Sequence, residues 1–266
     1  MDFTEDQIRR YARHIILPEV GGVGQARLLD AKVLVVGAGG LGSPLLLYLA
    51  AAGVGTIGIV DDDVVDLTNL QRQVIHRSDR LGMAKTESAQ AALAAVNPEV
   101  KVVQHRLRLD AANATAVIAD YRVVADGSDN FATRFLINDA CRLAGKTLVS
   151  AAVLRFDGQL ATFKAPGPCY RCLYPAAPEA DAVPSCAQAG VLGAMAGVMG
   201  SLQATEVLKE ILGIGDSLAG GLLIVDALST TFRKVRLRPD PACPLCGPQA
   251  TIRDLSAHGS TTHACG

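Results

Sequence analysis

The sequence predicts an α/β protein whose mainly parallel, Rossmann-like sheet carries helices on both faces. Three observations favour this fold. Short apolar runs rich in β-branched residues alternate with helical stretches of about ten to fifteen residues, an order that produces parallel strands. The glycine-rich turn Gly37-Ala-Gly-Gly-Leu-Gly42 links the first of these strands to a helix. Half of the 266 residues are hydrophobic, which supplies the core of one domain.

Residues 1–30 are expected to form an N-terminal helical arm. Thr4 is followed three residues later by Gln7, which is the spacing of a capping box, so a helix is expected to run from there to about His14. The glycine-rich stretch 21–24 is expected to interrupt the chain before a second, short helix begins.

Residues 31–165 are expected to form a nucleotide-binding, Rossmann-like region. Its apolar runs predict strands at residues 32–36, 56–60, 100–105, 122–125, 147–151 and 158–164. Hydrophobic periodicity and stop signals such as Asn97-Pro98 predict helices at residues 41–52, 83–96, 112–119 and 131–143. Strands that alternate with helices form crossover units, which place neighbouring strands parallel.

Residues 166–247 are expected to belong to the same domain, although their composition differs. The stretch 166–184 is rich in proline, alanine and cysteine and shows no periodicity. The regular elements expected after it are a long helix at 190–212 and two strands, at 220–226 and 231–237, that extend the sheet. Residues 248–266 carry no motif and are expected to be a mobile tail.

Composition argues against several classes of function. Lys and Arg number 25 and Asp and Glu number 26, so the basic excess of a nucleic-acid-binding protein is absent and no nucleic-acid partner is expected. The uncharged stretches 33–60 and 182–205 are interrupted by glycine, proline or glutamine, so neither is expected to span a membrane. Seven cysteines without a predicted signal peptide indicate a reducing compartment, which we take to be the cytoplasm.

The glycine-rich turn predicts a nucleotide site. Gly37, Gly39, Gly40 and Gly42 let the backbone turn sharply and approach phosphate oxygens, while the helix that follows offers free N–H donors. Asp61 ends the second strand, where an acid accepts hydrogen bonds from ribose hydroxyls. The alternative is a tight packing turn beside a solvated acidic cluster.

Two cations follow the second strand and bear on which nucleotide binds. Arg72 lies in Asn69-Leu-Gln-Arg-Gln73, and Lys85 follows twelve residues after this segment. Fixed cations suit a triphosphate, which carries more charge than the pyrophosphate of a dinucleotide. The alternative is that both cations are ordinary surface residues.

The segment Asp126-Gly-Ser-Asp129-Asn130 ends the fourth predicted strand, at the edge of the sheet that faces a ligand. Asp129 could hold Mg²⁺ that bridges phosphates. Equally, Asp129 or Asn130 could cap the helix that begins at Phe131.

Four cysteines form two C-x-x-C pairs, Cys169-Tyr-Arg-Cys172 and Cys243-Pro-Leu-Cys246. Together they supply the four thiolates of a tetrahedral, structural Zn²⁺ site, whereas either pair alone could be a redox pair. A further cysteine, Cys186, precedes the long helix; it is either a reactive thiol with a lowered pKa or a small buried residue.

Taken in order, these motifs resemble the MoeB/ThiF family, bacterial relatives of ubiquitin-activating enzymes. The match starts with Tyr11-x-Arg13-His14 and extends to about Gly247. The resemblance implies an adenylyltransferase that joins ATP to the C-terminal Gly-Gly of a ubiquitin-like sulfur-carrier protein and releases pyrophosphate. The family's ATP residues correspond to Gly40, Asp61, Asn69, Arg72, Gln73, Lys85, Asp129 and Asn130.

The resemblance has further implications. It gives Asp129 the role of Mg²⁺ ligand, and it implies a homodimer in which the partner subunit lends an arginine, here Arg13. Cys186 matches a cysteine that in some members forms a covalent link to the carrier or to a sulfur donor. A sulfurtransferase or cysteine desulfurase is therefore a further expected partner. The carrier would be the small subunit of molybdopterin synthase or the carrier of the thiamin pathway, which serve molybdenum cofactor and thiamin biosynthesis.

Two alternatives of other classes stay open at this stage. A nicotinamide-dependent oxidoreductase uses the same glycine turn, but it leaves Arg72, Lys85 and both cysteine pairs without a role. A non-enzymatic zinc adaptor could bind a ubiquitin-like partner with a degenerate nucleotide site, but it would not need Arg72, Lys85 or Asp129.

Overall fold

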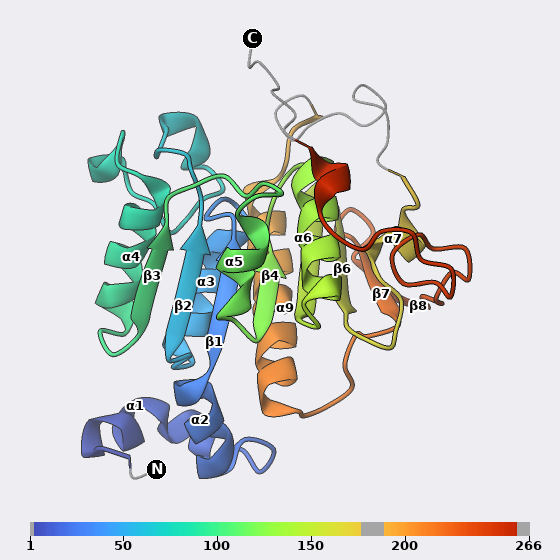
Figure 1. Cartoon of the computed structure of the whole chain (residues 1–266). Helices are drawn as coiled ribbons and strands as arrows, with labels where there is room; N and C mark the ends of the chain where they lie inside the picture. Colours follow the sequence, from blue (N-terminus) through green and yellow to red (C-terminus); the bar gives the residue numbers. More distant parts are fainter. Residues whose placement is uncertain (1–2, 177–188, 260–266) are drawn as a thin grey trace.

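A computed structural model of the chain describes residues 3–176 and 189–259, and one eight-stranded sheet organises it. The strands lie in the order β3-β2-β1-β4-β5-β6-β7-β8 (Figure 1). Strands β3 to β5 in this order are parallel, and β6, β7 and β8 continue the sheet antiparallel. The structure therefore confirms the predicted mainly parallel sheet that C-terminal strands extend.

The strands are β1 (Lys32–Val36), β2 (Thr56–Val60), β3 (Lys101–His105), β4 (Val123–Asp126), β5 (Thr147–Leu154), β6 (Asp157–Phe163), β7 (Gly221–Asp226) and β8 (Thr231–Arg236). The α-helices are α1 (Glu5–Ile15), α2 (Gly21–Asp30), α3 (Gly42–Ala51), α4 (Lys85–Val96), α5 (Ala114–Ala119), α6 (Phe131–Leu143), α7 (Tyr170–Leu173) and α9 (Gly193–Leu212). None of the helices in the described ranges has the length and apolar composition that a membrane crossing requires.

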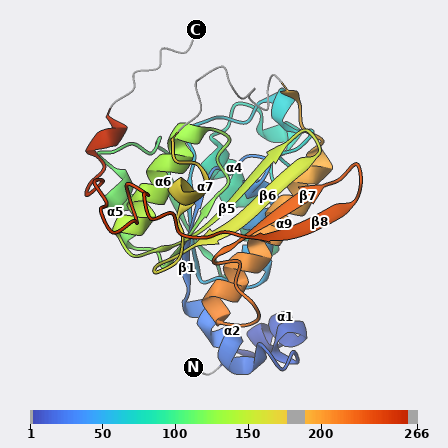
Figure 2. The same cartoon turned by 90° about the vertical axis from the view of Figure 1, so that its right-hand side faces the viewer.

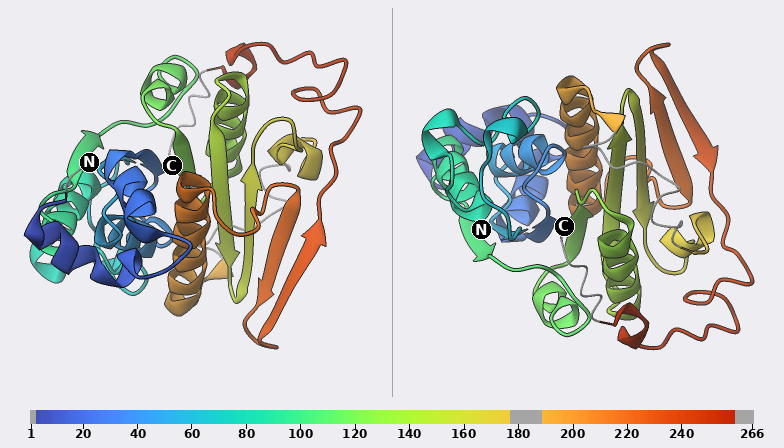
Figure 3. Two further views of the ribbon diagram at one scale, coloured as in Figure 1. Left: turned by 90° about the horizontal axis from the view of Figure 1, so that it is seen from below. Right: turned by 90° about the horizontal axis from the view of Figure 1, so that it is seen from above.

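Helices cover both faces of the sheet, as the views from below and above show (Figure 3). The alternation of side chains along β1 explains why its sequence is continuously apolar. Val33 and Val35 point into the core beneath α3, α4 and α9, whereas Leu34 and Val36 point into the core beneath α5 and α6. A strand buried on both faces needs apolar residues at successive positions.

The N-terminal arm lies at the end of the sheet where the parallel strands begin (Figure 1). The predicted capping box is present, with Thr4 and Gln7 each bonding the other's backbone. The glycine-rich stretch does not interrupt the chain as expected, because α2 begins at Gly21. A β-carbon at Gly24 would lie 3.1 Å from the Leu212 side chain of α9, so the absence of one lets the two helices approach closely.

The longer C-terminal strands differ from their predicted bounds. β5 continues to Leu154 and forms a hairpin with β6. Figure 2 shows β5 to β8 side by side, with α9 across one face. The stretch predicted to be irregular contains α7, which is four residues long and therefore too short to show a helical period. Residues 177–184 of that stretch lie outside the described residues.

The segment expected to be a tail is described to residue 259, and its end, around the turn Ser256–His258, lies beside α6 (Figure 1). Leu255 is buried in the same core cluster as the apolar face of α6. His258 donates a hydrogen bond of 2.7 Å from Nε2 to Oδ2 of Asp139, which is fully buried on α6. Arg171 of α7 donates to the same carboxylate over 2.7 Å. The tail and the first cysteine pair thus meet at one buried charge.

We expect Asp139→Asn to lower the free energy of unfolding by roughly 3 kcal/mol, since it leaves the Arg171 guanidinium without its anion. Burial acts to raise the pKa of Asp139, but the bonds from His258 and Arg171 hold that pKa below its usual value. The contribution is therefore complete above about pH 4 and is lost as the pH falls through the lowered pKa. Urea unfolding from pH 3 to 7 measures both effects, with exposed Asp216→Asn as the control. Equal loss in the two variants would contradict the prediction.

Candidate functional site

A cavity of about 350 Å³ opens at the carboxyl ends of β1, β2 and β4. Most of the predicted nucleotide-site residues line it, namely Gly37, Gly39, Gly40, Asp61, Arg72, Gln73, Lys85, Asp129 and Asn130. Three predicted residues, Gly42, Asn69 and Arg13, are not among the lining residues. Parallel strands end at one edge of the sheet, and this is why segments distant in sequence meet here.

The glycine turn is tight enough to require glycine at two positions. Gly37 has a φ of +92°, which side chains other than glycine rarely tolerate. A β-carbon at Gly42 would lie 1.9 Å from the carbonyl oxygen of Gly37. Gly42 therefore shapes the turn from beneath, at the start of α3, while Gly39 and Gly40 face the cavity.

Asp61 is fixed beside this turn by backbone donors. Its Oδ2 accepts a hydrogen bond from the Ala38 N–H at 2.8 Å, and its Oδ1 accepts one from the Asp63 N–H at 3.0 Å. Burial raises the pKa of Asp61, and the nearby Lys85 charge and these two bonds act in the opposite direction. The acid that follows β2 thus has a fixed orientation at the rim of the cavity.

Lys85, the first residue of α4, is a buried cation that points to the cavity. Its side chain is 7% exposed, and its Nζ lies 2.7 Å from Oδ2 of Asp63. Asp63 itself is 67% exposed, so most of the carboxylate stays in solvent. Sequence reasoning missed Asp63 as a counter-ion, since it saw only a run of three acids. The carboxylates of Asp61, Asp62 and Asp63 approach within 4.8 Å of one another.

The loop after β2 carries the other predicted residues. The carbonyl oxygen of Asn69 accepts hydrogen bonds from the N–H groups of Arg72 and Gln73, at 3.1 and 2.9 Å. Asn69 therefore shapes the loop even though it does not line the cavity. Arg72 donates from Nη1 to the carbonyl of Thr68 at 3.0 Å. Gln73 is buried, and its Oε1 has no hydrogen-bond partner among the described residues.

His76 supports the glycine turn from behind and was not predicted. Its Nε2 donates to the Ala38 carbonyl and its Nδ1 accepts from the Ser88 hydroxyl, both at 2.9 Å. Burial lowers the pKa of His76, which keeps the ring neutral and suits one donor and one acceptor. A lone histidine in a loop carries no sequence signal, so only the fold could place it.

The structure decides which residue caps α6. The side-chain oxygen of Asn130 accepts the Thr133 N–H at 2.9 Å, so Asn130 is the N-cap. Asp129 is exposed and lines the cavity, where its carboxylate is open to a ligand. Of the alternatives that the sequence left open, the capping role therefore falls to Asn130.

A buried ion pair lies beneath this loop and was also not predicted. Asp126 has no exposed surface, and it accepts hydrogen bonds from the hydroxyls of Ser128 and Ser150 at 2.6 and 2.8 Å. Arg134 of α6 approaches the same carboxylate to 3.7 Å and donates to the Ala151 carbonyl at 2.8 Å. The loop that carries Asp129 is thus attached to a network of fixed charges.

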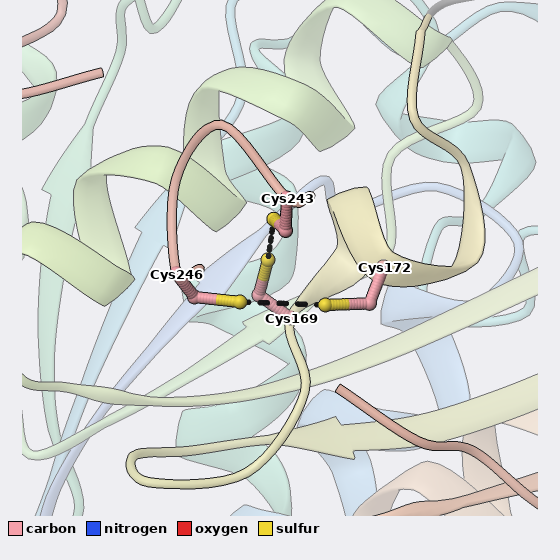
Figure 4. A group of neighbouring side chains, drawn as sticks. All are labelled: Cys169, Cys172, Cys243 and Cys246. Carbon is pink, nitrogen blue, oxygen red and sulfur yellow. Dashed lines mark hydrogen bonds between the residues drawn. The ribbon is translucent and has the colours of Figure 1, made fainter. Parts of the chain in front are cut away.

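The four paired cysteines meet in a separate cluster (Figure 4). The Sγ atoms of Cys169 and Cys243 are 3.6 Å apart, those of Cys172 and Cys246 are 3.3 Å apart, and all four lie within 4.8 Å of one another. Tetrahedral bonds to one Zn²⁺ would separate the sulfurs by about 3.8 Å. The donor set and its spacing therefore fit a four-coordinate metal ion.

Burial affects the cysteine thiols both inside and outside this cluster. Burial raises the pKa of Cys246 to about 12, with the Cys172 thiol adding to the effect, so a cation bound there would favour its ionised form. Cys141 lies on α6 and is buried in the core, and this burial raises the pKa of its thiol. Cys186, the predicted reactive thiol, lies outside the described residues.

The main cavity can bind a phosphorylated ligand. Its lining includes the cations Arg72, Lys85 and Arg108, and Arg134, which is paired with Asp126. Backbone N–H groups of the glycine turn and the amino end of α3 add further donors. No histidine lines it within the described part of the chain. The arrangement suits a reaction that needs charge stabilisation more than proton transfer.

Comparison with known proteins gives consistent matches. The ThiF family matches residues 11–245. The sulfur carrier protein adenylyltransferase of Thermus thermophilus is 51% identical over 261 residues, which cover 96% of each chain. The SAMP-activating enzyme E1 of Haloferax volcanii is 52% identical over 241 residues, or 91% of this chain and 89% of that one. MOCS3 of Bos taurus, an adenylyltransferase and sulfurtransferase, is 52% identical over 97% of this chain and 57% of its own length.

Solved structures share the fold at low sequence identity. E. coli MccB with AMPCPP and MccA has a TM-score of 0.78 and 23% identity, covering 92% of this chain and 75% of MccB. MccB with ATP has a TM-score of 0.72 and 22% identity, covering 84% and 68%. These likenesses support the Rossmann-like architecture and nothing more specific.

We expect the purified protein to hold one tightly bound metal ion per chain at the cysteine cluster. Cys246→Ser should lose most of that metal and lower Tm by several degrees, because the cluster joins segments about seventy residues apart in sequence. Cys141→Ala, at a buried cysteine outside the cluster, should keep the metal. Metal analysis and thermal unfolding measure the two effects. Full metal content in Cys246→Ser would show that the cluster is not the site.

Proposed function

The chain belongs to the ThiF family, and we propose on this premise that it transfers the adenylyl group of ATP to the C-terminal glycine of a ubiquitin-like sulfur-carrier protein and releases pyrophosphate. One observation carries the proposal. Arg72 and Lys85 line the same cavity as the glycine turn, together with Arg108 and Arg134, so cationic side chains face the place where phosphates would lie. The printed name of the Thermus thermophilus relative, a sulfur carrier protein adenylyltransferase, agrees with it.

The proposed adenylyl transfer needs cationic groups at the phosphates and no general base. The attacking group is the carrier's terminal carboxylate, which is already ionised at neutral pH, so the step needs no general base. One carboxylate oxygen forms a bond to the α-phosphorus of ATP. The bond between that phosphorus and the oxygen bridging to the β-phosphate breaks, and diphosphate leaves with the electron pair. The site must therefore align two anions and stabilise charge at the α-phosphate.

We assign the roles from the positions of the side chains. The turn from Gly37 to Gly42 and the amino end of α3 would hold phosphate oxygens. Asp61, which is fixed by backbone donors, would accept the ribose hydroxyls. Arg72 and Lys85 would neutralise the α-phosphate and the leaving diphosphate. Gln73 has a buried amide oxygen without a partner among the described residues, and this atom is free to accept a bond from the nucleotide.

Two metal ions complete the proposal. Asp129 would hold Mg²⁺, since its exposed carboxylate lines the cavity and oxygen ligands suit this ion. When bound, Mg²⁺ would screen the phosphate charges. Zn²⁺ is proposed for the cluster of Cys169, Cys172, Cys243 and Cys246, where four protein ligands leave no open position and the role is structural.

We also propose a homodimer. Arg13 is exposed on α1, at the opposite end of the sheet from the cavity (Figure 1). It therefore cannot reach the cavity of its own chain, and it would act in the cavity of a partner subunit.

Cys186 would form a covalent link with the carrier or a sulfur donor, and a sulfurtransferase or cysteine desulfurase would supply the sulfur. We propose the cytoplasm as the compartment, because cysteine thiols stay reduced there.

Two carriers are candidates: the small subunit of molybdopterin synthase and the carrier of the thiamin pathway. Exchange of labelled pyrophosphate into ATP tests the function with each purified carrier. We expect exchange only with a carrier that keeps its terminal glycine, and a carrier truncated by that residue is the control. Absence of exchange with both carriers, together with tight binding of NADH, would favour an oxidoreductase instead.

Asp129→Ala is expected to reduce exchange by at least about a hundredfold, because the cavity loses its proposed Mg²⁺ ligand. The fold should persist, since the Asp129 side chain is exposed. Steady-state exchange at saturating carrier measures the loss, and circular dichroism checks the fold. Asp79→Ala, at an exposed aspartate outside the cavity lining, should keep full activity. Normal exchange in Asp129→Ala would remove Asp129 from the site.

A further inference from the structure

Gln203 is a fully buried amide in the middle of α9. Its Nε2 donates hydrogen bonds to two backbone carbonyls, that of Asp126 at 2.8 Å and that of Val149 at 3.0 Å. Asp126 ends β4, and Val149 lies in the neighbouring parallel strand β5. One side chain thus joins a helix to two strands at the edge of the sheet where the cavity opens.

The carbonyl of Asp126 is the root of the loop that carries Asp129. The peptide that begins with this carbonyl leads directly into residues 127–130, all of which line the cavity. A hydrogen bond to the carbonyl fixes the plane of that peptide and hence the direction in which the loop leaves the sheet. The side chain of Asp126 holds the loop separately, through the N–H and hydroxyl of Ser128.

The same helix also contacts the opposite wall of the cavity. Ala196, two turns before Gln203, lines the cavity, and its side chain lies 3.2 Å from where a β-carbon on Gly40 would be. A β-carbon at Gly200 would lie 2.4 Å from the carbonyl oxygen of Leu41. α9 therefore contacts the glycine turn through small residues and the Asp129 loop through Gln203.

The amide of Gln203 is only half satisfied by its surroundings. The Oε1 of Gln203 is buried without a hydrogen-bond partner among the described residues. A buried polar atom without a partner is costly, and an apolar side chain of similar size would avoid that cost. The two bonds that Nε2 makes offset this cost, and one of them ends at the carbonyl from which the cavity-lining loop 127–130 starts.

We propose that Gln203 is a positioning residue, which sets the distance between the glycine turn and the Asp129 loop. The inference rests on the proposed adenylyl transfer, and it adds a residue that never touches the nucleotide. Correct spacing of the two walls would place the groups that act on the α-phosphate. Loss of the bonds would let the Asp129 loop move while the binding surface formed by Asp61 and the glycine turn stays in place.

The test compares Gln203→Leu with Gln203→Glu and with the control Thr205→Ala. Leucine keeps the bulk and removes both donors, whereas a neutral glutamic acid keeps one donor. Thr205 lies on the exposed side of α9, where its hydroxyl bonds only within the helix, to the Ser201 carbonyl. Exchange kinetics give kcat and KM for ATP. Amide hydrogen exchange of residues 127–130 reports on the loop independently of activity.

For Gln203→Leu we expect kcat to fall about tenfold to a hundredfold, with KM for ATP changed less than about twofold. Amide hydrogen exchange at residues 127–130 should become faster, while the amides of β2 and β3 stay protected. Gln203→Glu should give an intermediate loss, and it serves as the test variant if Gln203→Leu does not fold. Unchanged kcat and unchanged loop protection in the folded variant would overturn the inference, as would loss of protection throughout the sheet. If the wild type supports no pyrophosphate exchange with either carrier, the proposed function fails. Amide hydrogen exchange at residues 127–130 then still decides whether Gln203 positions the loop.

Discussion

The buried carboxylate of Asp126 is the interaction on which the cavity depends most. It ends a central strand, has no contact with solvent, and is surrounded by two serine hydroxyls and the Arg134 guanidinium. A buried charge is tolerable only when its lone pairs are occupied, so each of these neighbours is held in place by the need to satisfy it. The loop that leaves the strand therefore begins from a rigid base, and the exposed Asp129 obtains its position from groups that no ligand touches.

Helix α6 connects the surroundings of Asp126 with the segment that carries Cys169 and Cys172. Asn130, Arg134 and Asn138 recur every four residues and so lie along one side of the helix. Asn130 caps the helix at the cavity, Arg134 pairs with Asp126, and the Asn138 side chain accepts the Tyr170 N–H at 2.8 Å. The next residue, Asp139, holds Arg171 inside the first cysteine pair. The first cysteine pair is thus bonded to the same helix whose first turn borders the cavity.

The sequence predicted those parts of the fold and of the site that depend on neighbouring residues in the chain. The apolar runs of β1 and β2 and the periodicity of α6 were predicted to the residue, because burial on both faces or on one face leaves a direct pattern. The glycine turn and the cysteine pairs were recognisable from spacing for the same reason. His76, Gln203 and His258 gave no such signal. Their partners lie 38, 77 and 119 residues away, so their roles exist only after the sheet has assembled.

The charges that line the cavity limit the form in which a nucleotide can enter. Lys85 is already paired with Asp63, and Asp61, Asp62 and Asp129 face the same space. A bare triphosphate would meet these carboxylates as well as the cationic side chains of Arg72, Lys85, Arg108 and Arg134, and repulsion would offset part of the attraction. A nucleotide accompanied by a divalent cation changes this balance, since the carboxylates then become ligands or neighbours of a positive charge. With the proposed Mg²⁺ bound, the acidic residues and the cations of the cavity would act together on the phosphate chain.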